Sequence, residues 1–135
     1  MGQGFRVKAV LDTNVVVRHL IGDHPRQSPR ATRLFEGEHE LELSHVIFAE
    51  TVFVLEFFYG LERAHVAFLC WALLALPSVA IADPRLVLRA LAIYVQARID
   101  FADAYASAGS EASAKPILSF DRDLDRVSTV ERIEP

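Results

Sequence analysis

The fold class can be inferred from the first motif of the chain, Phe5-Arg-Val-Lys-Ala-Val-Leu-Asp12-Thr-Asn-Val-Val-Val-Arg-His-Leu-Ile-Gly22. Residues 5–11 are apolar with two interleaved cations, which predicts a strand. Residues 12–14 are typical of a turn or helix start, and a short helix over residues 15–21 is expected to end at Gly22. A strand that leads directly into a helix is the repeating unit of α/β proteins.

The rest of the chain continues this alternation. We expect further strands over residues 41–44, 79–82, 116–120 and 130–133. We expect helices over residues 28–35, 45–59, 61–76, 84–98 and 100–107, and a helical turn over 121–126. Ser28 is expected to cap its helix ahead of Pro29, and Gly109 to weaken or shorten the helix that begins at Asp100. The pattern predicts an α/β sandwich with a mostly parallel sheet.

Length and composition favour one globular domain over residues 1–135. The hydrophobic share of 52% is slightly above the usual range, which suggests apolar surface reserved for a partner. The single cysteine, Cys70, excludes an internal disulfide and fits a reducing cytoplasm. No signal peptide is recognisable, and the apolar run over residues 66–82 is interrupted by Pro77, so we expect no membrane association.

Several acidic residues are expected where strands end. Asp12 follows the first strand and Asp121 follows the strand over residues 116–120, while Asp100 and Asp103 open the helix that precedes that strand. Because ligand sites of parallel α/β sheets lie at the carboxyl ends of the strands, these acids can meet at one edge. Each also has a simpler interpretation, since Asp is a favoured helix cap and a first-turn acid interacts well with the helix dipole.

Glu50 is the least expected acid, because its helical neighbours Val46, Ile47, Phe53 and Val54 are all apolar. We expect a buried carboxylate that needs a partner, and no Lys or Arg stands within a turn of it. A metal ion would supply that partner. An oxygen-only set of carboxylates favours Mg²⁺ or Mn²⁺ over zinc, and such ions can activate water for phosphodiester hydrolysis. Glu56 in the same helix shows that one unexpected Glu does not decide the question.

Four motifs together resemble the PIN domain, and more closely its VapC-type toxin branch. They are Val-Leu-Asp12-Thr13-Asn14-Val, Ala49-Glu50, Asp100-Phe101-Ala102-Asp103-Ala104 and Ser119-Phe120-Asp121-Arg122-Asp123-Leu124. Their order matches along essentially the whole chain. The resemblance implies a three-layer α/β/α sandwich and a ribonuclease that uses Mg²⁺ or Mn²⁺. The catalytic metal ligands that it implies are Asp12, Glu50, Asp103 and Asp121.

The resemblance also implies supporting residues and partners. Thr13, Asn14 and Ser119 match positions that support the acidic site, and Asp100 matches a secondary metal ligand. The family habit implies a homodimer, for which the apolar excess gives a second reason. It further implies the toxin role in a toxin–antitoxin pair, with an RNA substrate and a small antitoxin whose peptide covers the helices near Arg18–Phe35.

Two other classes of protein have an acidic magnesium pocket on a parallel sheet. A receiver-like phosphoacceptor module would use Asp12 or Asp83 and the Lys115-Pro116 pair, but it leaves Glu50 unexplained. A haloacid-dehalogenase-like phosphatase would use Asp12 as nucleophile, yet Asn14 stands where a second Asp is expected. The net charge of −4 leaves nucleic-acid binding open, because metal-binding acids contribute to it. Four arginines are interpreted as solvated surface charge, with a phosphate track as the alternative: Arg18, Arg26, Arg30 and Arg33.

Overall fold

The computed structural model of the protein describes residues 6–135, which form two compact units. The N-terminal unit extends to Ala82 and the C-terminal unit covers Asp83–Pro135. Phe5, where the first strand was expected to begin, lies outside the described residues.

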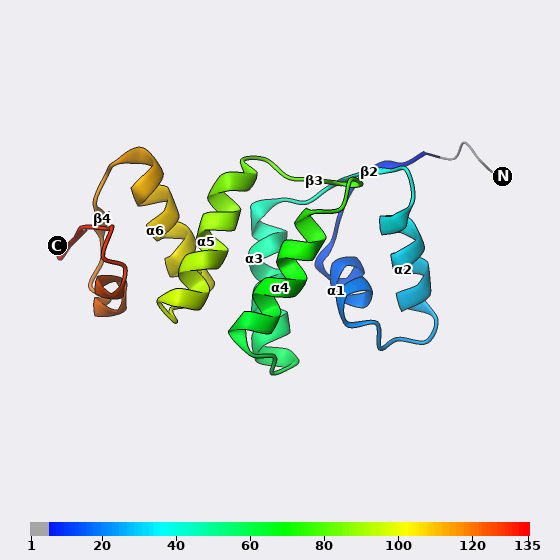
Figure 1. The fold of residues 1–135 in the computed structure, drawn as a ribbon, viewed down its shortest axis with the longest axis horizontal. Coiled ribbons are helices and arrows are strands. Elements are labelled where there is room, and N and C mark those ends of the chain that lie inside the picture. Colours follow the sequence, from blue (N-terminus) through cyan, green and yellow to red (C-terminus); the bar gives the residue numbers. More distant parts are fainter. Residues whose placement is uncertain (1–5) are drawn as a thin grey trace. The chain divides into compact units, whose positions relative to one another are not determined.

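The N-terminal unit contains a three-stranded parallel sheet with four α-helices (Figure 1). Its elements are β1 (Lys8–Val10), α1 (Thr13–Ile21), α2 (Gln27–Glu36), β2 (Glu40–Glu42), α3 (His45–Phe53), the π-helix η1 (Val54–Phe58), α4 (Arg63–Leu74) and β3 (Val79–Ala80). Strand β2 is central, and it pairs Ala9 with Leu41 on one side and Leu41 with Val79 on the other. Buried side chains such as Val16, Phe35 and Phe48 form the core of this unit.

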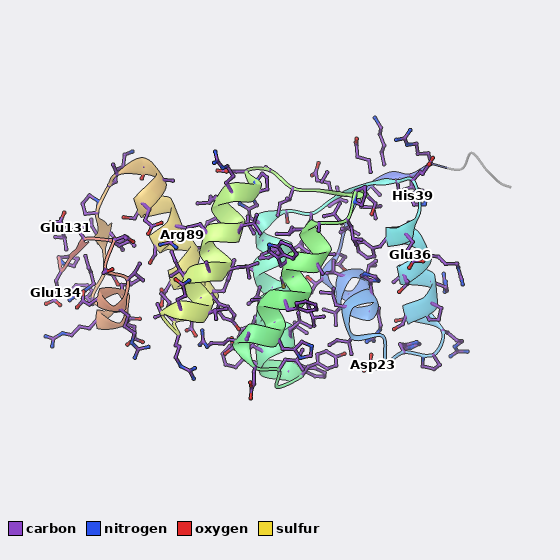
Figure 2. The ribbon with its side chains drawn as sticks, in the orientation of Figure 1. Asp23, Glu36, His39, Arg89, Glu131 and Glu134 are labelled. Carbon is purple, nitrogen blue, oxygen red and sulfur yellow. The ribbon has the colours of Figure 1, made fainter. Side chains whose placement is uncertain are left out.

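Two hydrogen bonds outside the strands join segments next to the sheet. One connects the residue before β1 to the residue before β2, and the other connects the residue before β3 to the end of α2. His39, which directly precedes β2 (Figure 2), accepts a hydrogen bond at its Nδ1 from the Val7 amide at 3.0 Å. The buried Ser78 hydroxyl donates to the Phe35 carbonyl at 2.6 Å, which ties the approach to β3 to the end of α2. These contacts join segments more than thirty residues apart in the sequence.

The C-terminal unit pairs two helices side by side and carries a short parallel sheet (Figure 1). Its elements are α5 (Pro84–Gln96), α6 (Phe101–Ser113), β4 (Ile117–Leu118), the 3-10 helix η2 (Arg122–Arg126) and β5 (Arg132–Ile133). Its core includes Tyr94 from α5 together with Phe101 and Ala104 from α6. Every strand pairing among residues 6–135 is parallel, as the sequence predicts.

Two local expectations are wrong. Ser28 does not cap α2: it is buried one residue inside the helix, and its hydroxyl accepts a hydrogen bond from the His24 amide at 3.1 Å. The His24 imidazole instead accepts a hydrogen bond from the backbone amide of Gln27, the first residue of α2, at 2.9 Å. Gly109 does not end its helix, because α6 continues one further turn to Ser113. Packing of α6 against α5 outweighs the low helix propensity of one glycine.

Among residues 6–135, no helix combines the length and apolar character that a membrane crossing needs.

Candidate active site

Asp12 connects the first strand to the first helix. It follows Leu11 in extended conformation, and its carboxylate accepts a hydrogen bond from the Thr13 amide at 2.9 Å. Its side chain is exposed, and the carboxylate oxygen not used by the cap is open to a ligand. The capping interpretation and the ligand interpretation of Asp12 are therefore compatible in one geometry.

Glu50 lies beside Asp12 because Thr13 connects them. The Thr13 hydroxyl donates a hydrogen bond to Glu50 Oε1, although the two residues are thirty-seven positions apart. Thr13 itself is buried, with 8% of its surface exposed, so this donor is held firmly in place. Asp12, Thr13 and Glu50 line one hollow of about 460 Å³, which we call the acidic hollow. Its other lining residues are Asn14, Val17, Arg18, Phe53, Val54, Phe58 and Tyr59.

The expected burial of Glu50 is wrong. Its side chain is exposed, and its apolar neighbours Val46 and Phe53 are themselves 77% and 60% exposed. Helix α3 buries the opposite face, which carries Phe48 and Val52. Both faces of this short helix are apolar, so the sequence pattern could not show which one is covered. The case for a metal at Glu50 therefore rests on its neighbour Asp12 and not on desolvation.

In the C-terminal unit, the acids gather around Asp103. Asp103 occupies the first turn of α6, and Asp100 precedes that helix without a side-chain capping bond. Partial burial raises the pKa of Asp103, and the nearby carboxylates of Asp121, Asp100 and Asp123 raise it further. Like charges this close favour a bound cation, which would relieve their repulsion. Asp123, an exposed residue of η2, belongs to this group.

Ser119 and Asp121 are in direct contact. The Ser119 hydroxyl accepts a hydrogen bond from the Asp121 amide at 2.9 Å, and the Asp121 carboxylate accepts one from the Asp123 amide at 2.9 Å. Ser119 also extends the pairing of the C-terminal sheet, since its amide donates to the Ile133 carbonyl at 3.1 Å. Asp121 thus lies just beyond the carboxyl end of β4, as Asp12 lies just beyond that of β1.

The eight predicted site residues therefore fall into two sets. Asp12, Thr13, Asn14 and Glu50 meet in the N-terminal unit, and Asp100, Asp103, Ser119 and Asp121 belong to the C-terminal unit. Within the described part of the chain, no three acidic, histidine or cysteine side chains are arranged as ligands of one ion. The donors are nevertheless all carboxylate oxygens, which is the chemistry that Mg²⁺ and Mn²⁺ prefer.

Asp12 and Asp121 each follow a parallel strand, and a hydroxyl contacts an acid in each unit, which defines the class as an α/β protein with acidic side chains beyond its strand ends. Comparison with protein families identifies the family within that class. The model of the PIN domain family matches residues 9–130. The match covers nearly the whole chain, and the chain belongs to the PIN domain family. Comparison with curated proteins finds no sequence match.

Family membership confirms the fold class predicted from the sequence, an α/β sandwich with parallel strands. PIN domains are generally nucleases, so the receiver-like and phosphatase interpretations are no longer needed.

Proposed function

We propose that this protein is a metal-dependent endoribonuclease in which Asp12, Glu50, Asp103 and Asp121 act on one scissile phosphodiester. The observation that carries the proposal is the matching placement of Asp12 and Asp121, each just beyond a parallel strand, in a chain of the PIN family. Mg²⁺ or Mn²⁺ would be held by these four carboxylates, with Asp100 as a secondary ligand. When bound, the metal supplies an activated water and stabilises the leaving oxygen.

The protein's own residues orient the carboxylates. Thr13 donates to one oxygen of Glu50, a residue that lines the acidic hollow, and leaves the other oxygen available to a ligand. Ser119 fixes the backbone at Asp121, and the Asp123 amide holds one Asp121 oxygen. Asn14 lines the acidic hollow and offers an amide for substrate oxygens.

The test is cleavage of single-stranded RNA by the purified chain with and without Mn²⁺. Asp12→Asn and Asp103→Asn should each abolish cleavage, because each removes a metal-binding charge at nearly constant shape. Asp23→Asn is the matched control, since Asp23 is exposed in the loop after α1 (Figure 2) and lines none of the hollows described. Full activity of both site variants would contradict the mechanism.

We further propose that the nuclease is the toxin of a toxin–antitoxin pair in the cytoplasm and inhibits growth by cleaving RNA. The resemblance of its motifs to VapC-type toxins supports this role. A small antitoxin would cover α1 and α2 over residues 18–35 and block the acidic hollow. Expression of the wild-type chain in a bacterial host should stop growth, while Asp12→Asn should not. Normal growth with active wild-type nuclease would remove the toxin role and leave the nuclease in place.

The homodimer proposal is supported by large apolar side chains at the surface. Phe58, Phe68 and Trp71 are 78%, 66% and 60% exposed, whereas single scattered apolar residues would be ordinary. We expect a dimer in sedimentation velocity at micromolar concentration and a weaker one in Trp71→Glu. A wild-type monomer at that concentration would contradict the proposal.

A further inference from the structure

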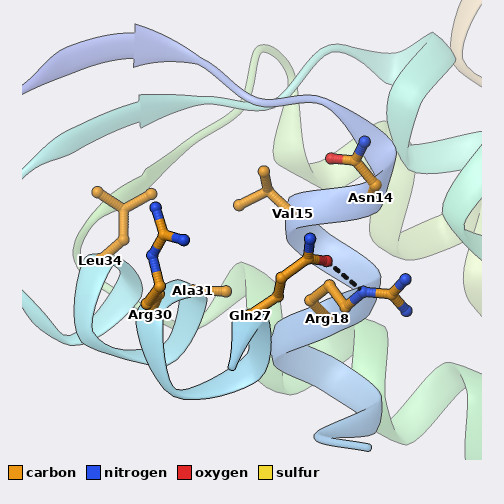
Figure 3. A pocket seen from close by; sticks show the side chains of 7 residues that line it. All are labelled: Asn14, Val15, Arg18, Gln27, Arg30, Ala31 and Leu34. Carbon is orange, nitrogen blue, oxygen red and sulfur yellow. Dashed lines mark hydrogen bonds between the residues drawn. The ribbon is translucent and has the colours of Figure 1, made fainter. Parts of the chain in front are cut away.

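A second hollow lies between α1 and α2 and is lined by two arginines, two amide side chains and three apolar side chains (Figure 3). Its volume is about 390 Å³, and we call it the arginine pocket. Helix α1 contributes Asn14, Val15 and Arg18 to its walls, and helix α2 contributes Gln27, Arg30, Ala31 and Leu34. Among residues 6–135, no acidic side chain lines it, although the whole chain has a net charge of −4.

The two guanidinium groups of the arginine pocket form no ion pair with the part of the chain that the structure describes. Within residues 6–135, neither Arg18 nor Arg30 lies within ion-pair distance of a carboxylate. Arg18 and Arg30 extend to opposite sides of Gln27 (Figure 3), so each guanidinium offers its own donors to an anion. Arginine is the side chain whose planar fork best matches the oxygens of a phosphate.

The polar groups of the pocket are mainly donors. Arg18 Nε donates to Gln27 Oε1 at 2.8 Å, the dashed line of Figure 3, so the Gln27 carbonyl oxygen is occupied and its amide NH₂ remains free to donate. Arg30 adds further donors from the facing helix. Apolar walls from Val15, Ala31 and Leu34 can pack against a sugar or a base. The pocket is thus suited to a ligand with an acceptor-rich anionic part and an apolar part.

We propose that the arginine pocket binds one nucleotide of the RNA substrate, with Arg30 on the phosphate next to the scissile one and Arg18 on the side of the acidic hollow that it also lines. This rests on the proposed nuclease function. Asn14 and Arg18 line both the arginine pocket and the acidic hollow, so the two hollows adjoin. RNA is favoured over an acidic peptide because each of its phosphates, which the arginine donors can bind, is accompanied by a base, which can pack against the apolar walls of Val15, Ala31 and Leu34.

Binding is measured by fluorescence anisotropy of a short labelled single-stranded RNA on the full chain carrying Asp12→Asn, which keeps the RNA intact. Arg30→Gln should weaken binding about tenfold and reduce the salt dependence by about 0.7 in slope, the share of one phosphate contact in a single strand. Arg30→Lys should fall between, because it keeps the charge but not the fork. Arg33→Gln is the matched control: Arg33 lies on the same helix and is exposed, but it does not line the pocket.

The variant Gln27→Glu distinguishes a loss of RNA binding from a loss of folded protein. A carboxylate at the first residue of α2 interacts favourably with the helix dipole, so this variant should melt no lower than the parent. In the pocket, the same carboxylate pairs with Arg18 and repels phosphate, so RNA binding should fall more than tenfold.

Cleavage by the otherwise wild-type chain provides the second readout. Arg30→Gln should raise KM with little change in kcat, as expected for a contact made equally in the ground state and the transition state.

Failure of the nuclease function and failure of this inference give different results. Absence of Mn²⁺-dependent cleavage by the wild type contradicts the function, whatever binds the pocket. RNA binding that is equal in the parent, Arg30→Gln and Gln27→Glu overturns the pocket assignment, even if cleavage is normal. Binding of a poly-glutamate peptide that depends on Arg30, without any Arg30-dependent RNA binding, would assign the pocket to a protein partner and also overturn the inference.

Discussion

At the scale of single residues, Thr13 is the residue of the acidic hollow that contacts both of its acids, Asp12 and Glu50. It is the first residue of α1, it is buried, and its hydroxyl bonds Glu50 across thirty-seven positions. Its amide meanwhile bonds the Asp12 carboxylate. Thr13 therefore contacts two acids, Glu50 through its side chain and Asp12 through its backbone amide, which makes it a positioning residue and not a catalytic one.

Replacing Thr13 by Val should lower RNA cleavage by about 10–100-fold, the usual loss when a residue that orients a metal ligand is removed. Valine fills nearly the same volume, so the melting temperature should change little. Thr13→Ser restores the hydroxyl and should recover most of the activity. If Val and Ser variants cleave equally well, the hydrogen bond to Glu50 has no role in the reaction.

At the scale of elements, α6 carries Asp103 and includes a glycine that its geometry does not require. Gly109 lies in the helix with ordinary backbone angles, and a Cβ added there would meet no atom within 4 Å. Gly22 differs, because it ends α1 at φ 73°, in the left-handed region that favours glycine.

Gly109→Ala should therefore raise the free energy of unfolding by about 0.5–1 kcal/mol, because alanine loses less conformational entropy in a helix. Gly22→Ala should lower it by roughly 1–2 kcal/mol, because it forces a Cβ into the left-handed region. Urea unfolding followed by circular dichroism checks both. A loss of stability in Gly109→Ala would mean that α6 does not continue past this residue in solution.

The contact between α5 and α6 includes a bidentate ion pair. Arg89 on α5 (Figure 2) donates through Nε and Nη2 to both oxygens of Glu111 on α6, each at 2.8 Å. The Thr129 hydroxyl also donates to Glu111. The hydrogen bond from Arg89 is the main cause that lowers the pKa of Glu111 from 4.5 to about 2.

A depressed pKa in the folded state means that ionised Glu111 stabilises the fold above pH 4.5 and that this contribution is lost as the pH falls toward 2. Glu111→Gln should cost about 1 kcal/mol at neutral pH, and its melting temperature should approach that of the wild type as the pH falls through this window. Glu131→Gln, at an exposed position, is the control. A difference between wild type and Glu111→Gln that is constant from pH 7 to about 2 would contradict the assignment.

At the scale of the whole molecule, the proposed reaction needs acids from both units. If they serve one metal site, Mn²⁺ should raise the melting temperature by mass action, because it binds only the folded protein. Asp12→Asn and Asp103→Asn should then each remove most of that increase. The metal-free variants should be as stable as the wild type or slightly more so, because repulsion falls. In Asp12→Asn, the new amide oxygen can still accept the hydrogen bond from the Thr13 amide.

The loss of the Mn²⁺-induced rise in melting temperature in the single and double variants shows whether the acids form one metal site or two. If each variant removes only its own share of the Mn²⁺ effect and the double variant removes the sum, the two sets of acids bind ions independently. That result would contradict a shared centre. If neither variant changes the Mn²⁺ effect, these carboxylates do not hold the metal at all.

Local signals were enough to locate most elements and the acids at their ends. The turn from β1 into α1 and the left-handed Gly22 depend on neighbours in sequence, so Asp12 could be placed correctly before any contact was known. The class of fold followed for the same reason, because strands that alternate with helices leave few packings open. The motif order was likewise sufficient to indicate the PIN family.

Only the tertiary structure decided which faces are covered and which distant residues meet. Helix α3 is apolar all round, so sequence pattern could not tell that Phe48 is buried while Phe53 and Glu50 are exposed. The Thr13–Glu50 bond joins segments that share no local signal. The length of α6 past Gly109 likewise depends on packing against α5, which is worth more than the propensity of one residue. Burial and long-range contacts are properties of assembled surfaces, whereas caps and turns are set by a few adjacent residues.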